Sequence, residues 1–346
     1  MPTTKANEPI ASFADGDTVT GFALLTKKER RQDKNGRDYL DLELTDATGR
    51  IAAKVWSDSR ALSGDYAGHD FVAFKGLVHD YRNQLQLNVK DCRRATEADR
   101  EHGFDEAALI PSTREDIDDL YTRLETTLLE NIERPLLERL VEETLEAHGA
   151  ALREHPAAKA IHHAYRGGLL EHMVSMLELA VPVCNHYPEL DRELVLIGIL
   201  FHDLGKIREL GAMPANDYTP EGRLVGHIVI SRDLLRERCQ AIEDFPADLQ
   251  LHLEHLILSH QGRLEFSSPV EPKTPEAFVL HFLDDLDSKL AQLRQARELG
   301  EDPQWVHGLG RYVYTRLNGN PEENGEQREE TDGESGADTD QAQLEL

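Results

Sequence analysis

Residues 198–206 read Gly-Ile-Leu-Phe-His-Asp-Leu-Gly-Lys, and this stretch decides the fold class. It places an ionisable pair, His202 and Asp203, at the end of an otherwise apolar segment that is predicted to be a helix. Burying a lone carboxylate there would be costly, and a cation is the usual compensation. Gly205 lets the chain leave the helix, and Lys206 follows as a candidate contact for phosphate.

The region around this stretch is predicted to be helical almost throughout, as far as about Leu317. Eleven of the sixteen histidines fall between His155 and His281. Because histidine is the commonest side-chain metal ligand, a histidine cluster on helices needs an explanation. Ahead of this region, a capped helix start follows Ser112, and Pro135 should kink or restart that helix. The later helices are expected at Gly168–Tyr187, Asp191–Lys206, Gly226–Ala241, Ala247–Ser259 and Pro275–Leu299.

The N-terminal part of the chain has a different pattern. Five short segments with partly alternating apolar and polar residues lie within about 80 residues, which suits a small OB-type barrel. Turns are expected near Ala47-Thr48-Gly49 and Arg82-Asn83. The five expected strands lie in residues 18–29, 37–46, 49–57, 69–81 and 83–92.

Taken together, these patterns divide the chain into six parts. They are an N-terminal extension (1–15), the five-stranded barrel (16–95), a linker (96–111), connecting helices (112–150), an all-α bundle (151–317) and a disordered tail (318–346). The tail carries ten acidic residues and one arginine, so it supplies −9 of the formal charge of −27. The total charge therefore does not argue against a local nucleic-acid surface elsewhere.

Targeting signals are not apparent in the sequence. No stretch approaches the roughly 20 apolar residues that a membrane span needs, and the first residues lack the apolar core of a secretory signal. The three cysteines lie far apart in sequence, at Cys92, Cys184 and Cys239. This is neither a disulfide framework nor a zinc knuckle, so we expect a cytoplasmic protein with no membrane partner.

The motif at residues 202–206 resembles the signature of the HD-domain phosphohydrolases. Members of that family bring together a histidine, a His-Asp pair and a later aspartate from separate helices of an all-α bundle. On this resemblance His172 is the first histidine, His202 and Asp203 are the pair, and Asp284 is the final aspartate. Asp285 and Asp287 stand close enough in sequence to be alternatives to Asp284.

The resemblance narrows to the YhaM-type 3′-5′ exoribonucleases, which carry an OB domain ahead of an HD domain. It covers the chain from about Gly16 to Leu299 in the same order. It rests on the following segments: HHAYRGGLLEH (162–172), LVGHIVIS (224–231), HLILSHQGRLEFSSPVEP (255–272) and TPEAFVLHFLDDLDS (274–288). Within these segments His227 and His260 match the extra histidines that let some HD enzymes hold a second metal. The resemblance also suggests a homo-oligomer.

These residue types fit metal-assisted phosphodiester hydrolysis. Nitrogen plus carboxylate ligands suit Mn²⁺, the metal we expect first, or Fe²⁺, Co²⁺, Ni²⁺ or Zn²⁺, better than Mg²⁺. One or two ions are expected. Asp203 would bridge the ions or bond the attacking water, and Lys206 would stabilise charge on the phosphate. His162 and His163 are expected to contact phosphate or protonate the leaving oxygen. The expected metal ligands are His172, His202, Asp203, His227, His260 and Asp284.

A candidate nucleic-acid surface lies in the first link of the barrel, which holds six basic residues in eleven. OB folds bind single strands with cations on phosphate and aromatic rings stacked on bases. A charged link is also what a solvated loop looks like, and some aromatic residues must fill the barrel. The expected binding residues are Lys27, Lys28, Arg30, Arg31, Lys34, Arg37, Tyr39 and Trp56.

The sequence thus favours a metal-dependent 3′-5′ exonuclease that hydrolyses single-stranded RNA, or also DNA, to nucleoside monophosphates. One alternative is an HD-type phosphohydrolase of a small nucleotide, which would have little need for a strand-binding domain. A second alternative is a non-catalytic binder of single strands, which would have little physical reason to keep the His172, His202, Asp203 and Asp284 set together.

Overall fold

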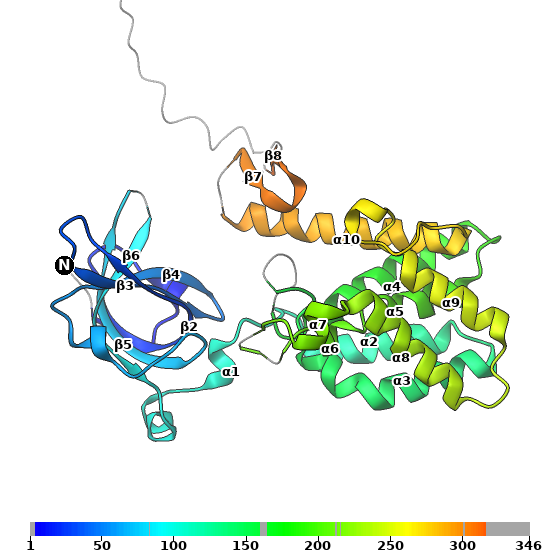
Figure 1. Ribbon diagram of the computed structural model, residues 1–346, viewed down its shortest axis with the longest axis horizontal. Coiled ribbons are helices and arrows are strands. Elements are labelled where there is room, and N and C mark those ends of the chain that lie inside the picture. Colours follow the sequence, from blue (N-terminus) through cyan, green and yellow to red (C-terminus); the bar gives the residue numbers. More distant parts are fainter. Residues whose placement is uncertain are drawn as a thin grey trace, which may run out of the picture. The chain divides into compact units, whose positions relative to one another are not determined.

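The computed structural model describes residues 4–82, 84–159, 165–211, 213–214, 216–299 and 302–315. Two hydrophobic cores are present, one inside a β-barrel and one inside a helical bundle. Figure 1 shows the barrel strands in blue to cyan and the helices of the second part in cyan-green to orange. The expected combination of a β-barrel followed by an all-α region is confirmed.

The barrel is closed by five strands. They pair in the order β2-β3-β4-β6-β5, and β5 returns to pair with β2. All neighbours are antiparallel except β4 and β6, which are parallel. This Greek-key order, with a parallel pair between its third and fifth strands, is the OB topology. The strand bounds are β2 Thr18–Gln32, β3 Asp38–Asp46, β4 Gly49–Val55, β5 Phe71–Asp80 and β6 Leu85–Arg94.

Alternation along β3 explains how the barrel forms. Leu40, Leu42 and Leu44 are buried in the barrel core, so the residues between them face outward. The hairpin to β4 turns at Ala47 and Thr48, as expected, because the Asp46 side chain accepts hydrogen bonds from the backbone of Thr48 and from Gly49. The outer face of β3 and β4 is thereby fixed in register.

Two features of the barrel differ from expectation. The basic segment that begins at Lys27 is not a loop, because β2 continues to Gln32 and pairs with β3 as far as Asp38. Only residues 33–37 form the connection. In addition, β1 (Thr4–Ala6) adds a parallel strand beside β2, within what was expected to be a plain extension. Three residues of ordinary polarity gave no strand signal.

Helices make up the second part of the chain, and their observed ends lie close to the expected ones. Pro135 opens α3 as its first residue, where its missing N–H costs nothing. The longer helices are α2 Ile117–Glu130, α3 Pro135–Glu154, α4 Gly168–His186, α5 Arg192–His202, α8 His227–Ala241, α9 Ala247–Ser259 and α10 Pro275–Leu299. The short ones are α1 Glu106–Leu109, α6 Lys206–Glu209 and α7 Pro220–Leu224.

Helix α5 is the centre of the bundle. Every residue from Leu194 to His202 is buried, and α5 packs against α3, α4, α8 and α9. A helix that is apolar all round has no face to offer to solvent, so it belongs in the interior. The His202–Asp203 pair therefore emerges at the end of a helix that is held on all sides.

The C-terminal residues depart from the expected helical pattern. Strands β7 (Gln304–Val306) and β8 (Arg311–Val313) form a short antiparallel hairpin. Alternation over three residues is too short to distinguish from a helix turn in the sequence. The expectation for the tail, residues 318–346, falls outside the described residues. Within the described ranges, no helix combines the length and the apolar character that a membrane span requires.

Candidate functional site

Five helices deliver the candidate ligands, and four of those ligands lie at helix ends. His202 is the last residue of α5, and Asp203 follows it. His227 is the first residue of α8, and His260 follows α9. The other two residues, His172 and Asp284, project from within α4 and α10. The six residues expected as metal ligands are thus brought to one place from separate segments.

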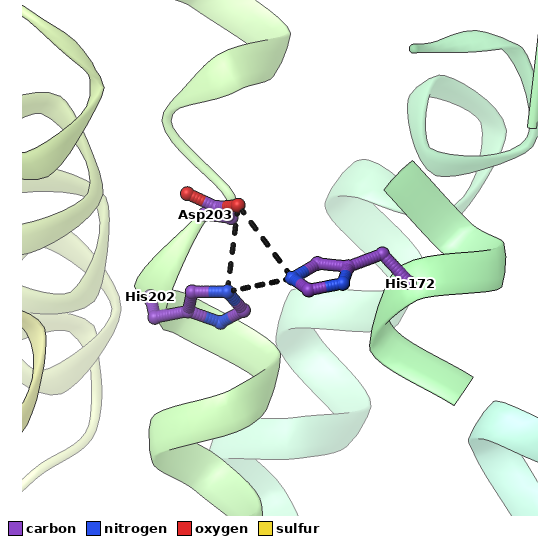
Figure 2. Close-up of side chains that lie close together, drawn as sticks. All are labelled: His172, His202 and Asp203. Atoms are coloured by element: carbon purple, nitrogen blue, oxygen red, sulfur yellow. Dashed lines mark hydrogen bonds and ion pairs between the residues drawn. The ribbon is translucent and has the colours of Figure 1, made fainter. Parts of the chain in front are cut away.

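The first cluster consists of His172, His202 and Asp203 (Figure 2). The two Nε2 atoms lie 3.3 Å apart. Asp203 Oδ2 lies 3.4 Å from Nε2 of His202 and 3.9 Å from Nε2 of His172. Asp284 Oδ1 lies 3.3 Å from the same atom of His172.

The second cluster consists of Asp203, His227 and His260. Here the other carboxylate oxygen of Asp203 takes part. Oδ1 lies 3.3 Å from Nε2 of His227 and 3.9 Å from Nε2 of His260. Asp203 therefore presents one oxygen to each cluster, and it is the only residue that the two clusters share.

The four histidines are oriented through their Nδ1 atoms. His202 and His260 each hold Nδ1 against the carbonyl oxygen three residues earlier, at 2.8 and 2.7 Å. His172 instead places Nδ1 2.8 Å from Oδ2 of Asp287, and His227 places it 3.1 Å from Oε1 of Glu209. With Nδ1 committed in this way, each Nε2 is directed at the cluster and is available as a ligand atom.

The pKa values of the site residues are shifted by deep burial and by neighbouring charges. Burial opposes the charged form of His172, but hydrogen bonds to Asp284 and Asp287 outweigh it and raise its pKa to about 9. Burial lowers the pKa of His260 to about 4. Burial also disfavours ionised Asp203, yet the positive charges of Lys206 and His202 hold its pKa well below the ordinary value. The site concentrates carboxylates that need positive charge close by.

The donor set fits a divalent transition metal. Two ligands that each lie about 2.1 Å from an ion are roughly 3–3.5 Å apart, close to the 3.3–3.9 Å found here. Two facing ligand atoms, Asp203 Oδ1 and His227 Nε2, are buried and make no hydrogen bond within the described part of the chain. A buried polar atom without a partner is costly, and a cation between the two would remove that cost.

The remaining expected catalytic residues fare differently. Lys206 Nζ donates to Asp203 Oδ2 at 2.5 Å, so it stands beside the cluster as expected. His162 and His163 lie outside the described residues. Of the three neighbouring aspartates, Asp284 faces the first cluster, Asp287 lies behind His172, and Asp285 is paired with Lys289 on the exposed side of α10.

The outer face of β3 and β4 gathers aromatic and basic side chains. The rings of Tyr39 and Trp56 lie 5.3 Å apart, and Lys54 lies over the Tyr39 ring at 5.3 Å. Trp56 is 39% exposed, and its Nε1 donates to Asn88 at 2.9 Å. An exposed ring held edge-on in this way offers its face to a base.

Acidic partners moderate the charge of the basic segment. Asp41 lies within 3.5 Å of Lys27, Arg31 and Lys54. Arg30 pairs with Asp38, and Arg37 pairs with Asp33. Lys34 is exposed on the connection.

Lys28 does not belong to this face. It donates to the Tyr66 carbonyl and lies over that residue's ring. Four of the remaining basic residues are thus in ion pairs with carboxylates, and the structure places Lys28 with Tyr66.

Several residues of the site escaped sequence reasoning. Lys54 was missed although the alternation of β4 puts it opposite Asp41. Asp287 was considered only as an alternative ligand, and Glu209 was not considered. The spacing of three residues between Asp284 and Asp287 signals one face of a helix, but it cannot tell which carboxylate meets the outer nitrogen of a histidine. That distinction needs the tertiary fold.

Comparison with protein families finds the HD domain at residues 169–289. This match spans all six candidate metal ligands. A second family model, described as "Putative helicase", matches residues 112–188 and ends before the His202–Asp203 pair.

Curated relatives match over most of the chain. The 3′-5′ exoribonuclease YhaM of Bacillus subtilis is 34% identical over 285 residues, which cover 82% of this chain and 88% of that protein. The 3′-5′ exoribonuclease YhaM of Bacillus velezensis is 35% identical over 287 residues, with the same coverage.

Among solved structures, the second OB-fold domain of replication protein A from Methanococcus maripaludis matches 26% of this chain and 96% of its own. The identity is 21% and the TM-score 0.23. A replication protein A heterotrimer bound to single-stranded DNA matches 28% of this chain and 75% of its own, at 18% identity and a TM-score of 0.21. Scores this low carry no conclusion, and the assignment of the barrel rests on its strand order.

Proposed function

The chain belongs to the family of the YhaM 3′-5′ exoribonucleases, and from this premise we propose that it hydrolyses single-stranded RNA from the 3′ end and releases nucleoside monophosphates. The observation that carries the proposal is the position of Asp203 between two ligand clusters. A shared carboxylate is the arrangement that two-metal phosphodiester hydrolysis needs.

Each residue near the centre then has a role. His172, His202 and Asp284 would hold one divalent ion with Asp203, and His227 and His260 would hold the other. When bound, the ions polarise the phosphoryl group and lower the pKa of the attacking water. Lys206, which donates to Asp203, would offset negative charge on the phosphate. His162 and His163 remain predicted contacts to the phosphate or the leaving oxygen.

The barrel binds the single-stranded RNA. Tyr39 and Trp56 stack on bases, while Lys27, Arg31 and Lys54 neutralise phosphates along the same face. Lys34 and Arg37 add positive charge on the β2–β3 connection, whereas Arg30, which lies opposite Leu40 in the register, is on the same side of β2 as Lys28. Lys28, which lies against Tyr66, is left out of the proposed face. Base stacking is tolerant of sequence, so binding with little sequence preference is expected.

Three further properties belong to the same proposal. Manganese is the favoured ion, because mixed imidazole and carboxylate donors suit it better than magnesium. We place the protein in the cytoplasm, since Cys92, Cys184 and Cys239 are all free and buried. Assembly into a homo-oligomer is expected from the family resemblance.

The products of hydrolysis test the proposal. Uniformly labelled single-stranded RNA incubated with the protein and Mn²⁺ should yield nucleoside monophosphates from the earliest times. Deoxynucleoside triphosphates and other small nucleotides, supplied separately, should be hydrolysed far more slowly. Efficient hydrolysis of a small nucleotide with intact RNA would favour the phosphohydrolase alternative. Strand binding without any hydrolysis across the five candidate metals would favour the non-catalytic binder.

A further inference from the structure

The two ways in which the histidines are oriented have different consequences. His202 and His260 are held by backbone carbonyls, which no substitution can remove. His172 and His227 are held by side-chain carboxylates, and each of these two histidines belongs to a different cluster. Each cluster therefore contains one histidine whose ring is oriented by a side chain, which is Asp287 of α10 for the first cluster and Glu209 of α6 for the second.

Asp287 is placed to fix the ring of His172. It is 2% exposed, and its Oδ1 accepts a hydrogen bond from Ser175 Oγ at 2.6 Å while Oδ2 faces Nδ1 of His172. Ser175 lies on the same helix as His172, so both oxygens of the Asp287 carboxylate contact side chains of α4. A buried carboxylate opposite Nδ1 keeps the proton on that nitrogen and makes Nε2 a better electron-pair donor.

Glu209 has the same relation to His227. It is 8% exposed, and its Oε1 accepts the backbone N–H of His227 at 2.9 Å and faces Nδ1 of the ring at 3.1 Å. Gly226 precedes α8 and provides no side-chain cap. Glu209, from α6, thus caps α8 and orients its first side chain with one oxygen atom.

We propose that Asp287 and Glu209 are positioning residues that set the affinity of the first and second metal sites separately, without touching either ion. The proposal rests on the two-metal site described under Proposed function. Asp203 is common to both sites, so a change at Asp203 affects both. A change at Asp287 or at Glu209 is expected to affect one site only. The chain could then lose one ion while it keeps the other.

The test uses the full-length protein and Mn²⁺ alone. The variants Asp287→Asn and Glu209→Gln keep the size and the hydrogen-bonding oxygen of each side chain and remove its charge. Mn²⁺ is titrated into the metal-free protein, and bound metal is counted after dialysis. Each variant should weaken one of two equivalents by about 10–100-fold, the usual effect of losing such a partner, and leave the other unchanged.

Combined variants identify which equivalent is lost. Asp287→Asn with His202→Ala should retain one tight equivalent, because both changes act on the first site. Asp287→Asn with His260→Ala should retain none. Glu254→Gln is the matched control, since Glu254 is a buried carboxylate whose two oxygens accept from Arg236 and not from a histidine. It should bind two equivalents as the wild type does.

The outcomes separate this inference from the proposed function. A wild-type protein that binds no Mn²⁺ would overturn both. A wild type that binds two equivalents, with Asp287→Asn and Glu209→Gln weakening the same one or neither, would overturn the inference alone. If Asp287→Asn does not fold, Ser175→Ala replaces it. That variant loosens Asp287 and should weaken the same first-site equivalent, while a thermal scan shows that the metal-free protein is still folded at the temperature of the titration.

Discussion

Asp203 Oδ1 lies 3.3 Å from Nε2 of His227, and neither atom makes a hydrogen bond in the part of the chain that the structure describes. The first atom comes from the end of α5 and the second from the start of α8. Two buried, unpartnered ligand atoms at this distance are explained by an ion that both contact. The same aspartate turns its other oxygen to His202 and His172, so the site is built around one carboxylate.

The close approach of α6 to α8 should be essential for the second cluster. A Cβ atom on Gly205 would lie 2.3 Å from the carbonyl oxygen of His227 and 2.6 Å from the Ser231 nitrogen. Gly205→Ala must therefore push the start of α8 outward, at an expected cost of about 1–3 kcal/mol in unfolding free energy. Mn²⁺ titration should show a weakened second equivalent. Gly49→Ala, where no atom lies within 4 Å, is the control and should change neither quantity.

Trp56 should contribute strongly to strand binding. Trp56→Ala removes the exposed half of the Tyr39–Trp56 pair, and loss of one stacked base costs about 1–3 kcal/mol. Fluorescence anisotropy with a labelled single-stranded RNA, in an Asp203→Asn background to prevent hydrolysis, measures this loss. Tyr187→Ala removes a comparably exposed ring from the end of α4 and should leave affinity unchanged. Equal affinity of Trp56→Ala and its parent for the RNA would mean that this face of the barrel does not bind the strand.

Asp41 should weaken RNA binding rather than support it. The Asp41 carboxylate is 9% exposed and offsets part of the positive charge of Lys27, Arg31 and Lys54. Asp41→Asn should release positive charge toward phosphates, tighten binding at low salt and steepen the slope of log affinity against log salt by roughly 0.7 for each added phosphate contact. Asp118→Asn, an exposed change of equal charge on α2, is the control. Weaker binding by Asp41→Asn would mean that the carboxylate chiefly holds the cations in position.

How much of this the sequence predicts depends on the kind of information required. The motif at residues 202–206 marks His202 and Asp203, and the resemblance to the HD-domain family adds His172 and Asp284, with Asp285 and Asp287 as alternatives to Asp284. These candidates can be found because the type and the order of the ligands are visible in the sequence. Alternation along the strands predicts the barrel. The partners behind the ligands do not follow from the sequence, since Glu209 meets His227 across 18 residues and Asp287 meets His172 across 115.

The misassigned basic segment has a different cause. Five charged residues in succession, Lys27–Arg31, are typical of a loop, yet β2 continues as far as Gln32 because β3 provides a full set of backbone partners. Pairing between strands outweighed local polarity. The hairpin of β7 and β8 was missed because three-residue strands carry too little pattern.

His148 should make stability fall in mild acid. Burial, followed by the charges of Arg238 and Arg208, lowers its pKa below 6.5. Below about pH 6.5 the unfolded chain therefore binds a proton at His148 that the folded protein does not bind. Protonation of His148 has no effect on the free energy of unfolding at high pH and lowers it as the pH falls below about 6.5. Chemical denaturation at pH 7.5 and 5.5 should show a smaller loss for His148→Gln than for the wild type. An identical loss in the two proteins would contradict this role.

The most direct test of the central claim is hydrolysis of a 5′-labelled single-stranded RNA with Mn²⁺ by the wild type and by Asp203→Asn. The account predicts a ladder that shortens from the 3′ end. It also predicts a rate lower by at least about 10³-fold in the variant, because the amide has a single oxygen and no charge and cannot serve both clusters as the carboxylate does. Chelation of the metal should stop the wild type as well. Undiminished hydrolysis by Asp203→Asn, or products that shorten from the 5′ end, would contradict the account.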